Sequence, residues 1–280
     1  MSDPPHRGVH PRKRFGQHFL HDRHALEQIA ALCEVTPDER LLEIGPGTGN
    51  LTETLLRTPA KDIVAIERDR SLLPVLRERF AGERLQLVEG DAVHADFEAL
   101  CPPDGRHVAV GNLPYNAGTE IYFRLLAHRT RIRRLVLMFQ REVAERIVAD
   151  AGSRSYGILS IMTALHGTSR IALRLAPGAF HPPPRVHSAV IVVDVDTHDR
   201  LDVAGDPRGF RRMVGGAFGA RRKTLPNALT REGWTREQVC EALERLEISP
   251  KIRGEALSPE QLAALWRQLQ GTALAGPETS

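Results

Sequence analysis

The sequence predicts an α/β protein with a parallel, doubly wound sheet followed by a small helical domain. From residue 41 onward, short runs of aliphatic and β-branched residues alternate with segments whose apolar residues have helical spacing. This alternation is typical of βαβ units. Beyond residue 209 the strand-like runs cease and helical spacing continues, which indicates a separate all-helical part.

Five runs are expected to form the parallel strands. They are residues 41–44, 63–66, 85–88, 107–110 and 135–139. Between them, apolar residues such as Leu72, Leu76 and Phe80 recur at helical spacing. Two later strand-like stretches, 170–175 and 188–195, are joined by the proline-rich AFHPPPRVH. We expect this closing hairpin to add antiparallel strands at one edge of the sheet.

The domain boundary is expected near residue 200. Apolar content falls and turn residues collect in DTHDRLDVAGDPRG, residues 196–209, as in a linker. We therefore assign residues 1–200 to the sheet-containing domain, with a basic N-terminal segment, and residues 201–280 to a helical domain.

Two helix starts in the second domain have a clear signature. Thr235 with Gln238, and Ser258 with Gln261, have the spacing of capping boxes, and Pro259 occupies a favoured first helical position. Both motifs precede apolar residues at helical spacing, so we expect a helix behind each.

Composition narrows the class of protein. With 41% hydrophobic and 26% charged residues in a chain of 280, we expect a soluble globular protein. No apolar stretch approaches the ~20 residues that span a bilayer, and no apolar run follows the basic start as in a signal peptide. The three cysteines form no C-x-x-C pair. We therefore expect a cytoplasmic protein without disulfides, a metal site or a membrane partner.

A glycine-rich turn follows the first expected strand. In EIGPGTGN, residues 43–50, Gly45 and Gly47 permit a tight turn and close approach of a ligand to the backbone. The dinucleotide fingerprint needs a third glycine where this chain has Asn50, and no Walker Gly-Lys-Ser/Thr follows. The turn therefore favours a nucleoside without a pyrophosphate. A tight turn without any ligand is the alternative.

Acidic residues end the next two expected strands. Glu67 follows Gly47 by about twenty residues, the distance at which an acid usually receives ribose hydroxyls. Asp91 follows the third strand in EGDA, where its carboxylate is suited to accept a hydrogen bond from an adenine amino group. Because ligands of open α/β sheets bind at the carboxyl ends of the strands, we expect these features to converge.

The fourth expected strand ends in GNLPYN, residues 111–116. Pro114 offers no N–H and holds Leu113 extended, so the segment presents carbonyl oxygens and the Asn112 amide as acceptors. Two acceptors that hold the hydrogens of an adenine amino group draw its nitrogen toward tetrahedral geometry. Tyr115 is suited to stack on the base. A turn with a buried tyrosine is the alternative.

These motifs resemble those of the ribosomal RNA adenine dimethyltransferase family, and they are most similar to its bacterial small-subunit branch. The likeness extends from Arg12 to about Leu269. It rests on RKRFGQHFL (12–20), LEIGPGTGNLT (42–52), IERD (66–69), GDA (90–92), GNLPYN (111–116), MFQREVAERI (138–147), SYGILS (155–160), FHPPPRVHSAV (180–190) and ARRKTLPNAL (220–229). The implied fold is the Rossmann-like class I methyltransferase sheet with a helical C-terminal domain.

The resemblance implies an enzyme that uses S-adenosylmethionine to dimethylate the N6 amino groups of two adjacent adenosines. The implied target is the 3′-terminal hairpin of small-subunit (16S) ribosomal RNA in the immature subunit, in ribosome biogenesis, with the enzyme as a monomer. For the cofactor, the implied contacts are with His18, Leu20, Gly45, Gly47, Glu67, Asp91 and Asn112. Position 18 is frequently asparagine in this family, and here it is histidine.

On the substrate side the resemblance implies direct transfer of the methyl group to nitrogen, with Asn112 between the cofactor and the target base. Phe180 precedes the prolines of HPPP, and we expect it to stack on the target base opposite Tyr115. An apolar cap on an edge strand is the alternative for Phe180.

Basic residues cluster although the net charge is only +3. In the C-terminal domain, Arg221, Arg222 and Lys223 stand together, with almost no acidic interruption in their surroundings. We expect these three residues to contact the phosphate backbone of RNA. A solvated helix face is the alternative.

Three other functions remain open at this point. A relative that dimethylates large-subunit RNA and confers macrolide resistance more often has isoleucine where this chain has Leu113. A non-catalytic RNA-binding or assembly factor on the same fold is a second alternative, although the acids and Asn112 are intact. A DNA adenine methyltransferase is the third, and it normally carries a separate target-recognition domain.

Overall fold

The computed structural model describes residues 17–203, 205–220 and 222–270. By their contacts the residues form two compact units. Of the described residues, the first unit contains 17–144 and 168–198, and the second contains 145–167, 199–203, 205–220 and 222–270.

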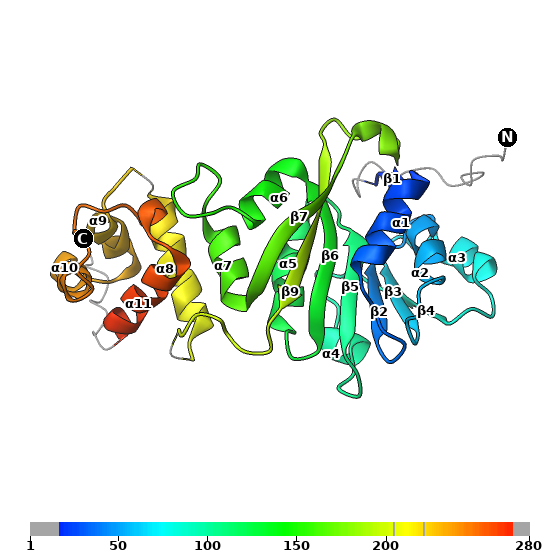
Figure 1. Cartoon of the computed structure of the whole chain (residues 1–280), viewed down its shortest axis with the longest axis horizontal. Helices are drawn as coiled ribbons and strands as arrows, with labels where there is room; N and C mark the ends of the chain where they lie inside the picture. The colour runs from blue at the N-terminus through cyan, green and yellow to red at the C-terminus, as the bar shows by residue number, and fades with distance from the viewer. Residues whose placement is uncertain (1–16, 204, 221, 271–280) are drawn as a thin grey trace. The chain divides into compact units, whose positions relative to one another are not determined.

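The first unit is built on a sheet in which seven strands of the described ranges have the order β4-β3-β2-β5-β6-β9-β7 (Figure 1). The strands are β2 (Arg40–Ile44), β3 (Ile63–Glu67), β4 (Leu85–Glu89), β5 (His107–Asn112), β6 (Ile132–Gln140), β7 (Gly167–Leu175) and β9 (Ser188–Val195). Strands β4, β3, β2, β5 and β6 pair in parallel, and β9 pairs antiparallel with β6. The α/β fold with its parallel strands and antiparallel closing strand is confirmed.

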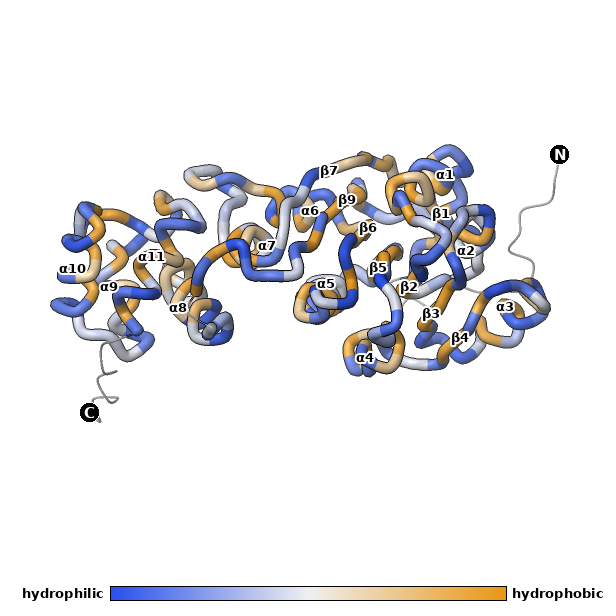
Figure 2. The backbone as a smooth tube through the Cα atoms, turned by 60° about the horizontal axis from the view of Figure 1, so that its bottom comes forward, coloured by the Kyte–Doolittle hydropathy of each residue, from blue (hydrophilic) through white to orange (hydrophobic). Residues whose placement is uncertain are grey.

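Helices cover both faces of this sheet (Figure 2). On one side lie α1 (Arg23–Leu32) and α2 (Asn50–Leu55), and on the other lie α4 (Phe97–Leu100) and α5 (Gly118–Ala127). Helix α3 (Leu73–Arg79) follows β3, and α6 (Arg141–Ile147) follows β6. Helix α1 begins at Asp22, whose carboxylate accepts the Ala25 N–H at 3.0 Å, as expected of an N-cap.

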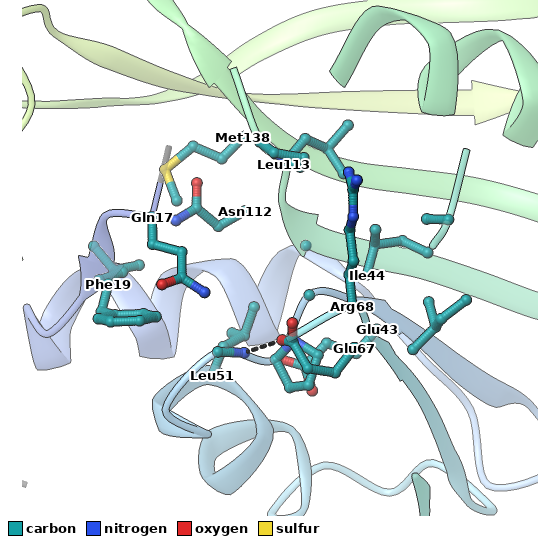
Figure 3. Close-up of a pocket in the computed structure, with 18 of the residues that line it drawn as sticks. Gln17, Phe19, Glu43, Ile44, Leu51, Glu67, Arg68, Asn112, Leu113 and Met138 are labelled. Carbon is teal, nitrogen blue, oxygen red and sulfur yellow. Dashed lines mark hydrogen bonds between the residues drawn. The ribbon is translucent and has the colours of Figure 1, made fainter. Parts of the chain in front are cut away.

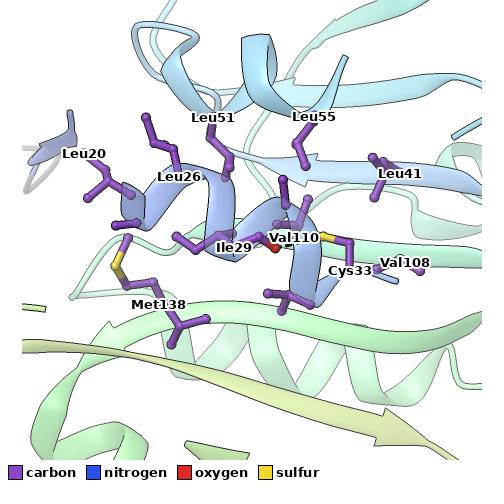
Figure 4. Packing of buried hydrophobic residues seen from close by; sticks show 14 of the residues in the cluster. Leu20, Leu26, Ile29, Cys33, Leu41, Leu51, Leu55, Val108, Val110 and Met138 are labelled. Atoms are coloured by element: carbon purple, nitrogen blue, oxygen red, sulfur yellow. Dashed lines mark hydrogen bonds between the residues drawn. The ribbon is translucent and has the colours of Figure 1, made fainter. Parts of the chain in front are cut away.

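The core beneath α1 explains why these strands are so apolar. Leu26 and Ile29 of α1, and Cys33 directly after it, belong to one buried cluster with Val108 and Val110 of β5 (Figure 4). The intervening residues of β5 face the other layer, because successive side chains of a strand alternate between faces. On that side, the ring of Tyr122 from α5 meets Phe139 of β6 edge-on, with centroids 5.8 Å apart. Burial on both faces is what a parallel sheet requires.

A short pairing joins distant parts of the first unit. Strand β1 (Phe19–Leu20) pairs antiparallel with β8 (Phe180–His181), with Leu20 opposite Phe180. The sequence did not predict this pairing. It attaches the N-terminal segment to the connection between β7 and β9.

The second unit is helical, in agreement with the sequence. Its helices are α7 (Ile158–His166), α8 (Pro207–Gly219), α9 (Leu225–Leu229), α10 (Arg236–Arg245) and α11 (Pro259–Gln270). Both expected capping boxes form: the Thr235 amide donates to Gln238 at 2.7 Å, and the Ser258 amide donates to Gln261 at 2.9 Å. None of the helices in the described ranges is long and apolar enough to cross a bilayer.

Residues 145–167 group with these helices, although the sequence assigned them to the sheet-containing domain. The reason lies at Tyr156. Its hydroxyl donates to the Leu257 carbonyl at 2.9 Å, and its buried ring lies edge-on to Phe218 at 5.6 Å.

Gly111 provides a test of strand packing. A Cβ at this position would lie 2.5 Å from the Ile44 carbonyl oxygen and 3.1 Å from the Ile44 Cβ. Replacing Gly111 with alanine therefore forces β2 and β5 apart, and we expect the free energy of unfolding to fall by about 1–3 kcal/mol. Urea denaturation measures this change. Gly105→Ala is the control, because a Cβ there meets nothing within 4 Å; equal stabilities of the two variants would contradict the prediction.

Candidate active site

A pocket opens at the carboxyl edge of strands β2, β3, β4 and β5 (Figure 3). The residues expected to converge there from the ends of these four strands all line it: Gly45, Gly47, Glu67, Asp91 and Asn112. The other expected site residues on its wall are His18, Leu20, Leu113, Pro114 and Tyr115. The predicted convergence is therefore present in the structure.

The turn between β2 and α2 has the backbone conformation that glycine permits. Gly45 has φ +68° and Gly47 has φ +60°, in the left-handed region that side chains disfavour. A Cβ on Gly47 would lie 2.9 Å from the ring of Phe19. The turn thus needs glycine both for its conformation and for the close packing of β1 over it.

Glu67 is buried at the end of β3 and fixes this turn. Its Oε2 accepts the Gly47 N–H at 3.0 Å, and its Oε1 accepts the Asp69 N–H at 2.7 Å. Burial raises the pKa of Glu67, although these two amides favour its ionised form. Each carboxylate oxygen has a second lone pair, so the residue retains acceptor capacity for a hydroxyl in the pocket.

Asp91 lies in an ion pair that the sequence did not predict. Its Oδ2 is 3.1 Å from Nη1 of Arg68, and its Oδ1 accepts the Val93 N–H at 3.0 Å. Arg68 follows Glu67 in the sequence and also lines the pocket. Its place in the IERD motif is the feature of the sequence that could have indicated a role in the site. A ligand amino group that approaches Asp91 must share the carboxylate with this guanidinium.

Asn112 has a fixed amide orientation. Its Nδ2 donates to the His18 carbonyl oxygen at 2.8 Å. A carbonyl only accepts, so the amide nitrogen must face it, and Oδ1 is the atom that Asn112 can offer to an amino group. In Figure 3 this side chain lies between the side chains of Gln17 and Met138.

The Pro114 carbonyl of the same motif already accepts hydrogen bonds from the protein itself. The Pro114 oxygen accepts the N–H groups of Ala117 at 3.1 Å and Gly118 at 2.7 Å, where α5 begins. The Leu113 amide donates to the Met138 oxygen at 3.2 Å. Of the carbonyl acceptors expected in this motif, the Pro114 carbonyl is therefore occupied, and the carbonyl of Leu113, the residue after Asn112, is the one proposed to accept from a ligand.

Residues 17–20 line the pocket and lie between the glycine turn and β8. Gln17 donates through Nε2 to Asp69 Oδ2 at 3.0 Å, and Asn50 donates through Nδ2 to the Leu20 carbonyl at 2.9 Å. Sequence reasoning singled out neither Gln17 nor Asp69 for the site, because polar residues beside a motif carry no periodic signal.

The two aromatic residues expected to hold the base have different environments. Tyr115 lines the pocket, and its hydroxyl lies 2.9 Å from Ser188 Oγ. Phe180 is only 2% exposed, belongs to the buried cluster beneath α1, and is not part of the pocket wall. The structure therefore does not place Phe180 opposite Tyr115. Its position favours the alternative of an apolar strand cap, because pairing of β8 with β1 turns the ring into the core.

Comparison with known proteins agrees with this arrangement. The model of the ribosomal RNA adenine dimethylase family matches residues 8–270. The chain belongs to this family. The ribosomal RNA small subunit methyltransferase A of Geobacter metallireducens is 44% identical over 267 residues, covering 94% of this chain and 96% of that protein. The protein of the same name from Syntrophotalea carbinolica is 44% identical over 260 residues, covering 93% and 97%.

Two solved structures are similar to this chain over most of their length. A dimethyladenosine transferase from Plasmodium falciparum has a TM-score of 0.78 at 25% identity, covering 91% of this chain and 98% of that chain. The 23S rRNA methyltransferase ErmE has a TM-score of 0.70 at 26% identity, covering 90% and 99%. Both matches extend over most of this dimethylase-family chain.

The charges on the pocket wall fit S-adenosylmethionine, the cofactor of this dimethylase family. The ligand carries a sulfonium and an ammonium against one carboxylate, so a negative pocket stabilises it. Three acidic residues, Glu67, Asp69 and Asp91, line the wall against one guanidinium, that of Arg68. A fourth acid on the wall, Glu43, is buried and has a pKa raised to about 8, so it adds no full charge at neutral pH. The same charges disfavour a polyphosphate, in agreement with the sequence expectation of a nucleoside without a pyrophosphate.

Of the residues expected to bind RNA, Arg222 and Lys223 are exposed, and Arg221 lies outside the described residues.

In the described part of this dimethylase-family chain, no group of three or more histidine, cysteine or acidic side chains is placed to hold a metal ion.

Glu43, on the pocket wall, makes the stability of the protein depend on pH. It is 1% exposed and accepts the Thr52 hydroxyl at 2.7 Å. Burial, together with the nearby Glu67 carboxylate, raises the pKa of Glu43 to about 8, although the hydrogen bond from Thr52 favours the ionised form. In the unfolded chain an ordinary glutamate ionises near pH 4.5. Between these pH values the folded protein keeps a proton that the unfolded chain has released.

As pH rises from 5 to 8, titration of Glu43 therefore lowers the free energy of unfolding of the wild-type protein by up to ~1.4 kcal/mol per pH unit. Glu43→Gln removes this titration and keeps an acceptor for Thr52. We expect the variant to gain stability relative to wild type as pH rises through this window, measured by urea denaturation at several pH values. Glu78→Gln, at an exposed position of α3, is the control. A stability difference for Glu43→Gln that does not change with pH would refute the prediction.

Proposed function

We propose that this chain dimethylates the N6 amino groups of two adjacent adenosines in the 3′-terminal hairpin of small-subunit ribosomal RNA, with S-adenosylmethionine as the methyl donor. The observation that carries this proposal is the orientation of Asn112, whose Oδ1 is available to an amino group at the edge of an acid-lined pocket. The small-subunit assignment is supported by relatives 44% identical over nearly the whole chain that are named small subunit methyltransferase A.

The chemistry requires the protein mainly to position the amino group. When bound, S-adenosylmethionine supplies a methyl group already activated by its sulfonium. Asn112 Oδ1 and the Leu113 carbonyl accept the two hydrogens of the adenine amino group. Its lone pair, which is conjugated with the ring in the free base, is thereby directed toward the cofactor side of the pocket. Tyr115 supports the base by stacking.

We assign no general base to this reaction. A nitrogen that has gained a methyl group is cationic, and it loses its proton readily to solvent. The residues in the site therefore act through position and hydrogen bonding, and mutation of a titratable group is not expected to mimic the loss of Asn112.

The RNA itself is proposed to be held by the basic cluster of the C-terminal unit. An enzyme that draws a base out of its stack must grip the phosphate backbone at the same time. Exposed Arg222 and Lys223, with Arg221, provide that charge. We further propose that the chain acts as a monomer on the immature small subunit.

The large-subunit alternative has less support. The structure of ErmE, a 23S rRNA methyltransferase, is similar at 26% identity, well below the 44% of the small-subunit relatives. A non-catalytic role is disfavoured because the expected cofactor residues line one pocket.

The decisive experiment is incubation of the protein with labelled S-adenosylmethionine and, in separate reactions, undermethylated small subunits, undermethylated large subunits or DNA. A reaction without nucleic acid is the blank. Mass spectrometry of the digested nucleosides identifies the product. We expect N6,N6-dimethyladenosine from small subunits only. Label confined to large subunits or DNA would replace the proposed substrate, and no label in any arm would support a non-catalytic role.

Asn112→Ala removes the oriented acceptor. We expect kcat on small subunits to fall by ~10²–10³-fold, as for other single oriented groups in a transition state, because the amino group is no longer directed. The affinity for S-adenosylmethionine, measured by calorimetry, should change by less than ~10-fold, since one hydrogen bond contributes about 0.5–1.5 kcal/mol. Thr119→Ala, at an exposed position on α5, is the control. Full turnover by Asn112→Ala would exclude the proposed mechanism.

Arg222→Ala combined with Lys223→Ala tests the RNA contact. Each phosphate contact contributes ~0.7–0.9 to the slope of log affinity against log salt concentration. We therefore expect weaker binding of undermethylated small subunits and a slope smaller by about 1.4–1.8, with cofactor affinity unchanged. Arg236→Ala combined with Arg245→Ala removes the same charge from α10, where glutamates intervene, and should change the slope less. Equal slopes for wild type and the first variant would contradict the assignment.

A further inference from the structure

One face of Tyr115 is covered by the imidazole of His18. The two rings are stacked, with centroids 5.6 Å apart and planes inclined by 29°. A base placed between two aromatic walls needs ~7 Å, because each stacked contact takes about 3.5 Å. The space beside this face of Tyr115 is therefore too narrow for an adenine while the imidazole stays in place.

Tyr115 itself is held in position. Its hydroxyl lies 2.9 Å from Ser188 Oγ, and Ser188 is completely buried in β9. The residues before it are fixed as well, because the Leu113 amide donates to Met138 and the Pro114 carbonyl accepts two amides of α5. Access to this ring face therefore depends on movement of His18 rather than of Tyr115.

The main chain and the side chain of His18 have separate attachments. The His18 carbonyl holds the Asn112 amide, and the next residue, Phe19, is paired with β8. The imidazole is held by the Tyr115 stack and by a hydrogen bond between Nδ1 and the Pro182 carbonyl at 2.7 Å. A carbonyl only accepts, so Nδ1 is the donor. The ring is thus free to turn about its side-chain bonds while the carbonyl stays on Asn112.

We propose that His18 is a substrate-positioning residue. Its imidazole occupies the binding position of the target base on Tyr115 until the extruded adenine displaces the imidazole, which we call the place-holder role. The inference rests on the proposed function, because it assigns the Tyr115 face to the target adenine. On entry the adenine replaces the imidazole on Tyr115, and the Nδ1–H of His18 leaves Pro182 for solvent. The oriented amide of Asn112 is undisturbed throughout.

This role makes a directional prediction. The wild-type enzyme gives up one stacked contact and one hydrogen bond whenever it accepts a base, so removal of the ring should favour base entry. Structural damage to the site would act in the opposite sense. A gain in apparent affinity for the RNA therefore distinguishes the place-holder from a residue that only supports the fold.

The test compares His18→Ala, His18→Asn and His18→Phe with wild type. Alanine removes the ring and its donor, asparagine retains a donor without the ring, and phenylalanine retains a ring without the donor. We expect KM for undermethylated small subunits to fall by about 3- to 10-fold in the alanine and asparagine variants. In the phenylalanine variant KM should stay near or above the wild-type value. KM for the subunits is measured at saturating S-adenosylmethionine, so that a change in cofactor affinity at His18, which lines the pocket, does not enter the comparison.

His24→Ala, at an exposed histidine of α1, is the matched control, and urea denaturation checks that each variant is folded. If the alanine variant is not folded, the asparagine variant decides. A KM that is unchanged or raised in a folded variant without the ring overturns the place-holder role. Absence of methyl transfer to small subunits by wild type would instead overturn the proposed function.

Discussion

The hydrogen bond from the Asn112 amide nitrogen to the His18 carbonyl is the interaction on which the site depends. It joins residues 94 positions apart and decides which atom of the amide faces the pocket. Both ends are held by separate structures. Asn112 ends a strand in the interior of the sheet, and His18 precedes a strand that is anchored on β8. The catalytic orientation is therefore a property of the assembled first unit and not of the GNLPYN motif alone.

Charge on the pocket wall supplies the second constraint. Carboxylates at the ends of β2 and β3 lie in one pocket, and burial raises the pKa values of both Glu43 and Glu67. A pocket of this kind is costly to keep ionised when it is empty. A cationic ligand relieves that cost, whereas an anionic one increases it. Selection for the charge of the cofactor is thus built into the strand ends, in addition to any hydrogen bonds that a ligand makes.

Much of the fold and the wall of the site followed from the sequence because the signals were periodic or depended on one residue type. The apolar runs located the strands, and Gly45 and Gly47 located the turn. Features that depend on pairing at long range were not predictable. Strands β1 and β8 have two residues each, too few for a pattern, and their pairing is what buries Phe180. The grouping of residues 145–167 with the C-terminal helices likewise depends on contacts of Tyr156 that no local pattern reveals.

The separate roles of main chain and side chain at position 18 explain how this position differs from the frequent family pattern without loss of the site. The atom that orients Asn112 is a backbone carbonyl, and every residue type supplies it. The side chain is then open to variation, and here it is an imidazole stacked on Tyr115. Because transfer from an activated methyl donor depends chiefly on position, a change at this side chain alters access of the base while it preserves the group that directs the amino nitrogen.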